Sequence, residues 1–127
     1  VKGAYMEPPE VAIPRKADVD EAYRRLALRM LRDRKEGRMG FVGVGTHDAR
    51  LIGEAARTAA ALGLARADWE VEMLYGIAVQ EQNRLHGAGT PLRVLISYGA
   101  HWFPWYMRRL AERPANVAFV LRQVVRR

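Results

Sequence analysis

Short apolar runs alternate with longer amphipathic stretches along the chain. Four runs have the length and the glycine or charged borders of strands: residues 1–5, 41–44, 69–75 and 92–97. The run at 41–44 is apolar apart from its glycine, as expected of a strand buried on both faces. The run at 69–75 alternates charged and apolar residues, which suits a half-buried strand or a helix start, and we favour the strand.

Amphipathic stretches between these runs predict helices. After an extended segment with three prolines, Asp18 and Glu21 have the spacing of a capping box, and the helix is expected to end at Gly37. Its predicted apolar stripe comprises Val19, Ala22, Tyr23, Leu26 and Met30.

Three further helices complete the pattern. Asp48 is expected to cap a helix that ends near Gly63, a second helix spans residues 77–86, and a last one begins near Pro104 and continues past Pro114. The predicted inner stripe of the helix after Asp48 comprises Leu51, Ile52, Ala55, Ala59 and Leu62.

The alternation of strand and helix predicts an α/β fold of four consecutive parallel βα units with right-handed crossovers. Four units form an open sheet or about half of a (β/α)₈ barrel, which typically needs about 250 residues. We therefore expect residues 1–127 to form a single partial domain. The chain begins at Val1 rather than at a methionine, which we interpret as the sign of a fragment.

Composition and charge narrow the class of protein. Half of the 127 residues are hydrophobic, which indicates a globular domain, and the 21 Lys and Arg against 14 Asp and Glu give a formal net charge of +7. The basic residues are spread along the chain, so a solvated basic surface is the default interpretation. With no cysteine and no apolar run near the roughly 20 residues of a membrane span, we predict a soluble, cytoplasmic protein.

Two adjacent arginines near the C-terminus are the first candidate site. A guanidinium is always charged and binds a carboxylate through two parallel hydrogen bonds, most strongly where aromatic rings exclude water. Arg108 and Arg109 therefore predict a site for a small carboxylate, although a basic helix turn over a core aromatic cluster remains the alternative. Four aromatic residues precede them within five positions: Trp102, Phe103, Trp105 and Tyr106.

Four segments together resemble blocks of the flavin-dependent proline dehydrogenase family. They are VKGAY at 1–5, VGTHD at 44–48, WEVEMLYG at 69–76 and WFPWYMRRLAERPAN at 102–116. The resemblance implies the C-terminal half of a distorted (β/α)₈ barrel that oxidises L-proline to 1-pyrroline-5-carboxylate through FAD. It also implies a missing N-terminal half, a quinone acceptor at the membrane surface and hence peripheral membrane association of the enzyme.

The resemblance assigns substrate contacts to four residues. Arg108 and Arg109 would hold the proline carboxylate, in agreement with the argument from their geometry. Glu112, one helical turn beyond them, would orient an arginine or meet the substrate nitrogen, and its alternative role is an ordinary helix salt bridge. Tyr5 would line the proline pocket, or else pack as a core strand residue.

Cofactor contacts are implied at two strand ends. At the first, Lys2, Gly3 and Ala4 resemble the family's flavin contact, where glycine permits close backbone approach and an ammonium neutralises phosphate or reduced flavin. At the second, Thr46, His47 and the following helix N-terminus would supply donors to FAD, although a histidine there is otherwise a capping or surface residue. The other histidines lack partners at metal-ligand spacing, so no metal site is expected.

Three departures from the family pattern bear on specificity. Leu95 takes the place of a tyrosine near the flavin, Glu72 that of a common glutamine, and Trp105 that of a tyrosine that packs on substrate. The sequence therefore leaves open proline, hydroxyproline or another cyclic imino acid as substrate.

Two other classes of function stay open. A nucleic-acid-binding module would use the arginines and aromatics for phosphate and stacking contacts, and would bind oligonucleotides with a steep salt dependence. An inactive structural half-barrel would bind no flavin. The enzyme interpretation implies no nucleic-acid partner.

Overall fold

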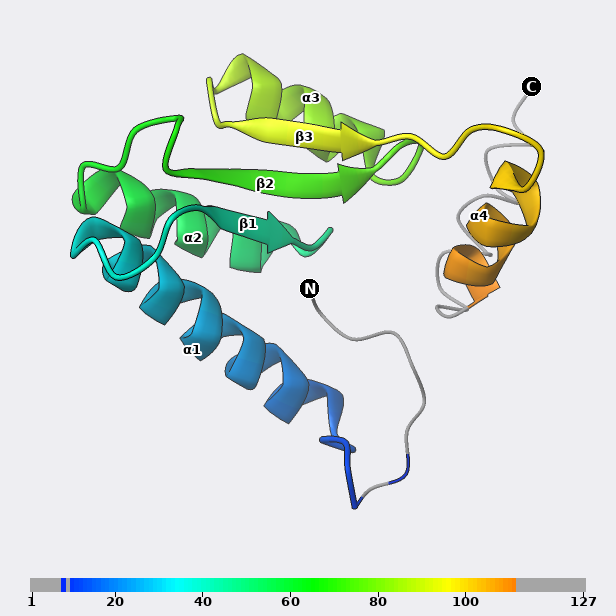
Figure 1. Cartoon of the computed structure of the whole chain (residues 1–127), viewed down its shortest axis with the longest axis horizontal. Coiled ribbons are helices and arrows are strands. Elements are labelled where there is room, and N and C mark those ends of the chain that lie inside the picture. The colour runs from blue at the N-terminus through cyan, green and yellow to red at the C-terminus, as the bar shows by residue number, and fades with distance from the viewer. Residues whose placement is uncertain (1–7, 9, 112–127) are drawn as a thin grey trace. The chain divides into compact units, whose positions relative to one another are not determined.

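The computed structural model describes the backbone of residues 8 and 10–111, and the side chains of these residues except 106 and 108–111. The described residues fall into two units that divide after Leu95 (Figure 1). The strand predicted at 1–5 and the helix continuation past Pro114 lie outside the described residues.

Three helices and three strands make up the first unit. They are α1 (Lys16–Lys35), β1 (Val42–Gly45), α2 (Ala49–Ala61), β2 (Trp69–Leu74), α3 (Val79–Gly87) and β3 (Leu92–Leu95). The described part of the second unit holds α4 (Trp102–Ala111).

The strands form a parallel sheet in the order β1-β2-β3. Its register places Val44 beside Val71, and Val71 beside Leu92. Because α2 joins β1 to β2 and α3 joins β2 to β3, consecutive βα units repeat along the sheet (Figure 1). The predicted α/β class is confirmed, and the ambiguous run after residue 68 is a strand.

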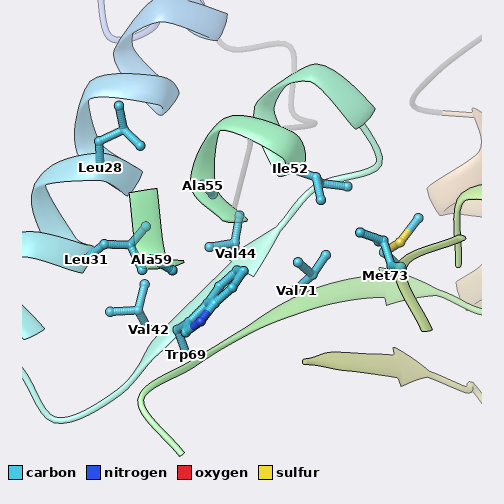
Figure 2. Packing of buried hydrophobic residues seen from close by; sticks show 11 residues of the cluster. Leu28, Leu31, Val42, Val44, Ile52, Ala55, Ala59, Trp69, Val71 and Met73 are labelled. Atoms are coloured by element: carbon cyan, nitrogen blue, oxygen red, sulfur yellow. The ribbon is translucent and has the colours of Figure 1, made fainter. Parts of the chain in front are cut away.

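Alternate strand residues face the helices and form the core. Val71 is completely buried, and Trp69 and Met73 on the same side of β2 are nearly so. Side chains of β1, β2, α1 and α2 interlock there (Figure 2). Transfer of each such side chain from water contributes about 1.5–3 kcal/mol, so this face supplies much of the stability of the unit. The buried cluster comprises Leu28, Leu31, Val42, Val44, Ile52, Ala55, Ala59, Trp69, Val71, Met73 and Leu85.

The start of α1 differs from the prediction. The N-cap residue is Arg15, which makes no side-chain cap, so the capping box at Asp18 and Glu21 is wrong. Asp18 lies in the first turn and accepts two hydrogen bonds from the Arg15 guanidinium, at 2.7 and 2.9 Å. The helix therefore begins at Lys16, and the Asp18 carboxylate in its first turn favours it through the helix dipole.

The buried stripe of α1 is also displaced from the predicted one. Leu28 and Leu31 enter the core, whereas Leu26 is 58% exposed. Tyr23 and Met30 pack against the core as partly buried residues, as expected. Leu26 lies about 200° around the helix from Leu28, because each residue turns the helix by about 100°.

Most other boundaries agree with the sequence. Gly37 and Gly63 follow α1 and α2 with φ of 75° and 65°, values that glycine adopts without strain. α4 begins two residues before Pro104, which therefore occupies the first turn, where no backbone N–H is needed. Within the described part of the chain, no helix has the length and apolarity required to cross a membrane.

Candidate functional site

The carboxyl edge of the sheet gathers the ends of all three strands. Because β1, β2 and β3 are parallel, the residues after Gly45, Leu74 and Leu95 lie along one edge. In parallel α/β folds this edge carries ligand sites, since loops there are free to vary over a rigid sheet. Thr46 and His47, both predicted cofactor contacts, leave β1 at this edge.

The loop from β1 to α2 is held by its own side chains. Thr46 is only 4% exposed, and its Oγ1 accepts a hydrogen bond from the Asp48 N–H at 3.1 Å. The Asp48 carboxylate accepts from the N–H groups of Arg50 and Leu51, at 3.1 and 3.3 Å, so the predicted cap is confirmed. These two amides of the α2 N-terminus are therefore already engaged by the Asp48 carboxylate.

His47 connects the ends of two strands. Its Nε2 accepts a hydrogen bond from the Leu74 N–H at 2.9 Å. An imidazole nitrogen that accepts carries no proton, so neutral His47 carries its proton on Nδ1. The hydrogen-bond donor of the neutral ring is therefore on Nδ1.

The turn after β2 is organised by Gln82 of α3. Its Nε2 donates to the carbonyl oxygens of Leu74 and Ile77, at 2.9 and 2.8 Å. Within this turn, Gly76 has φ of 77° and Ala78 has φ of 54°, the left-handed region that alanine rarely adopts. The side-chain amide therefore holds a strained connection in place.

The face of the sheet opposite the helices is charged. Glu72 lies over Gly43 of the neighbouring strand, where an added Cβ would come within 2.5 Å of Glu72 Oε1. On the same face as Glu72, Arg93 pairs with Glu70 across β2 and β3, and this hydrogen bond raises the pKa of Arg93. Tyr23 of α1 packs against the core, and burial together with the Glu72 carboxylate raises the pKa of Tyr23 to about 12.

The arginine pair lies in the second unit. Arg108 and Arg109 are consecutive residues of α4, whose side chains are outside the described set. In the aromatic segment before them, the rings of Trp102 and Phe103 meet edge to face at 5.5 Å, and both are about half exposed. Exposed aromatic surface of this kind is suited to contact with a ligand or another part of a protein.

The predicted site residues thus divide into three groups. Thr46 and His47 lie together at the carboxyl edge of the sheet, and the arginine pair lies on α4. Outside the described residues are Lys2, Gly3, Ala4, Tyr5 and Glu112. Among the described residues, no group of three or more His, Cys, Asp or Glu side chains is arranged to hold a metal ion.

Sequence reasoning missed the contributions of Leu74 and Gln82. Leu74 acts through its backbone N–H and C=O groups, which no side-chain pattern reveals. Gln82 has one visible signal, because it is a polar residue in the first turn of the helix that follows the Gly76 turn after β2. That signal alone does not distinguish it from a solvated helix residue.

Comparison with known proteins gives a consistent result. Residues 1–122 match the family described as proline dehydrogenase. A proline dehydrogenase of Deinococcus radiodurans is 43% identical over 126 residues, which is 99% of this chain and 39% of that protein. Proline dehydrogenases 2 and 1 of Bacillus subtilis strain 168 are each 38% identical, over 127 and 128 residues. The chain spans about 40% of the length of these relatives.

Proposed function

Because this chain belongs to the proline dehydrogenase family, we propose that it forms part of an enzyme that oxidises L-proline to 1-pyrroline-5-carboxylate with FAD as cofactor. The observation that carries the proposal is the family match over residues 1–122, supported by relatives aligned with nearly the whole chain. The bound flavin would supply the redox chemistry, by accepting the hydride from the ring carbon next to the proline nitrogen.

The architecture proposed for this chain is the C-terminal half of a (β/α)₈ barrel. Three parallel strands in sequential order, with their helices packed on one face, are what successive units of such a barrel require. Residues 1–5 would supply the strand of the first of the four predicted βα repeats. The remaining strands would come from an N-terminal half, which is the principal partner we expect.

The proposed substrate site centres on α4. Arg108 and Arg109 would bind the proline carboxylate through paired hydrogen bonds, with Tyr5 against the substrate ring and Glu112 orienting an arginine. Electrons would leave to a quinone at the membrane surface.

The proposed cofactor site combines two strand ends. Thr46 and His47 follow β1 in a loop held by hydrogen bonds, and their hydroxyl and imidazole groups would contact the phosphates or ribityl chain of FAD. Lys2, Gly3 and Ala4 would complete the site from the first strand, where glycine allows the backbone to approach and the ammonium supplies positive charge.

Charge pairing in the described residues favours the enzyme over a nucleic-acid-binding module. Several of the described basic side chains are engaged with acids on the same or neighbouring elements. Arg24 binds both Glu21 and Glu54, and Arg34 binds Asp68 at 2.6 Å. Neutralised surface arginines offer little counterion release to a polyanion.

The test is proline-dependent reduction of a dye acceptor by three preparations: the 127-residue chain alone, the chain co-expressed with an N-terminal half from a relative, and the full-length gene product carrying this sequence. We expect activity and bound yellow flavin in the second and third but none in the first, because half of the pocket is missing from it. Activity in none of the three preparations would refute the proposed function. Activity of the chain alone would refute the proposal that an N-terminal half supplies part of the pocket.

Substitution of the arginine pair tests whether Arg108 and Arg109 bind the proline carboxylate. Arg108→Lys and Arg109→Lys should each lower kcat/KM for proline by roughly 10²- to 10³-fold, because lysine cannot reproduce a two-bond contact with a carboxylate. Arg25→Lys on α1, an exposed arginine, is the matched control and should leave kcat/KM unchanged. An equal loss of kcat/KM in Arg25→Lys and Arg108→Lys would contradict the proposed contact between Arg108 and the proline carboxylate.

A further inference from the structure

The end of β2 is held from both sides by side chains of different elements. His47, from the loop after β1, accepts the Leu74 N–H at 2.9 Å, and Gln82, from α3, donates to the Leu74 carbonyl at 2.9 Å. These two backbone groups flank the same Cα. The position of Leu74 is therefore fixed by residues on either side of it in space.

Gln82 also closes the turn that follows. It donates to the Ile77 carbonyl at 2.8 Å, while the Ile77 N–H approaches the Leu74 carbonyl at 3.3 Å. The turn leads into Ala78, whose left-handed backbone is unfavourable for a residue with a Cβ. Such a conformation persists only where the surroundings impose it, and Gln82 supplies two of the bonds that do so.

The Leu74 amide selects one form of His47. A backbone N–H can only donate, so the nitrogen it meets must hold a lone pair. Neutral histidine has two tautomers of similar stability in water, and this contact favours the one with its proton on Nδ1. A partner that orients a histidine in this way commonly changes the affinity of the histidine for its ligand by 10- to 100-fold, as is seen for metal-bound histidines.

We propose that Gln82 is a positioning residue: by fixing Leu74, it holds His47 in the Nδ1–H tautomer and in the orientation in which this side chain would contact the bound cofactor. The identity of that cofactor rests on the proposed function. The selection of the tautomer does not, because it follows from contacts among residues of this chain.

The experiment measures the His47 tautomer directly, in the full-length gene product carrying this sequence and stripped of cofactor. At a pH above the range in which imidazole is protonated, side-chain ¹⁵N chemical shifts distinguish a proton on Nδ1 from a proton on Nε2. The signal that is lost in His47→Gln belongs to His47. We expect wild-type His47 to carry its proton on Nδ1. A proton on Nε2 would overturn the proposal without any further variant.

Three substitutions on α3 then isolate Gln82. Gln82→Met keeps the approximate shape but removes both donors, and should mix the two tautomers, speed hydrogen exchange of the Leu74 amide and weaken flavin binding on the order of tenfold. Gln82→Lys retains N–H donors and should preserve the Nδ1–H form. Gln80→Met changes an exposed glutamine of the same helix and should behave as wild type.

The outcomes separate this proposal from the proposed function. An unchanged tautomer and unchanged Leu74 exchange in Gln82→Met would refute the positioning role. If Gln82→Met does not fold, loss of the Nδ1–H form in a folded Gln82→Lys protein would refute it equally. The expected tautomers in a protein that neither binds flavin nor oxidises proline would refute the proposed function alone.

Discussion

The two faces of the sheet show how one strand serves two purposes. On β2, Trp69, Val71 and Met73 point into the helix-covered face and are at most 4% exposed, whereas Glu70 and Glu72 between them point to the opposite face. Burial of the first set stabilises the fold, and charge on the second set is tolerated because those carboxylates have specific neighbours. The alternation of side chains along one strand thus separates the residues that stabilise the core from those that carry charge.

The largest effect should come from the helix-covered face. Trp69→Ala should lower the free energy of unfolding of the protein carrying this sequence by about 3–5 kcal/mol, because it removes a buried aromatic side chain and leaves a cavity. Urea denaturation measures the change, and Trp69→Phe keeps most of the volume if the alanine variant does not fold. Glu70→Ala, the adjacent residue on the other face, is the matched control and should change stability by at most about 1 kcal/mol. Similar losses at both positions would contradict the division between the faces.

A smaller effect should come from the contact between Gly43 and Glu72. Gly43→Ala places a Cβ 2.5 Å from Glu72 Oε1, so the carboxylate at the end of that flexible side chain must move aside, and we expect the unfolding free energy to fall by about 1 kcal/mol or less. Glu72→Gln keeps the length of the side chain and should leave the penalty in place, whereas Glu72→Ala combined with Gly43→Ala should relieve it. Thermal denaturation of the single and double variants measures the coupling. Additive effects would show that the two residues do not meet.

A pH dependence at high pH is expected from Tyr23. Its pKa is raised from 10.0 to about 12 in the folded chain, by burial first and by Glu72 second, so folding favours the protonated phenol. This stabilisation is complete below pH 10 and is lost as pH rises from 10 towards 12. With a discount for solvent screening, the loss should be on the order of 1–2 kcal/mol. Tyr23→Phe should flatten this part of the profile when unfolding is measured from pH 9 to 12, and an unchanged slope would contradict the assignment.

Local patterns in the sequence determined the class of fold. Period-two and period-3.6 apolar spacing located the strands and helices of the described units to within a few residues, since burial of one face requires that spacing. Asp48 and Gly63 also behaved as predicted, because a cap and a left-handed terminus depend on neighbours in sequence. The capping box at Asp18 failed because Arg15, a neighbour that the motif ignores, pairs with that carboxylate.

The sequence also indicated the candidate site, through Thr46, His47, Arg108 and Arg109 and through the resemblance of whole segments to the proline dehydrogenase family. Only the tertiary structure decided that His47 accepts from Leu74 and that Gln82 holds the same residue from α3. These contacts join residues 27 and 8 positions apart, and one partner in each is a backbone group. Backbone groups are the same at every non-proline position, so their partners are fixed only when the chain folds.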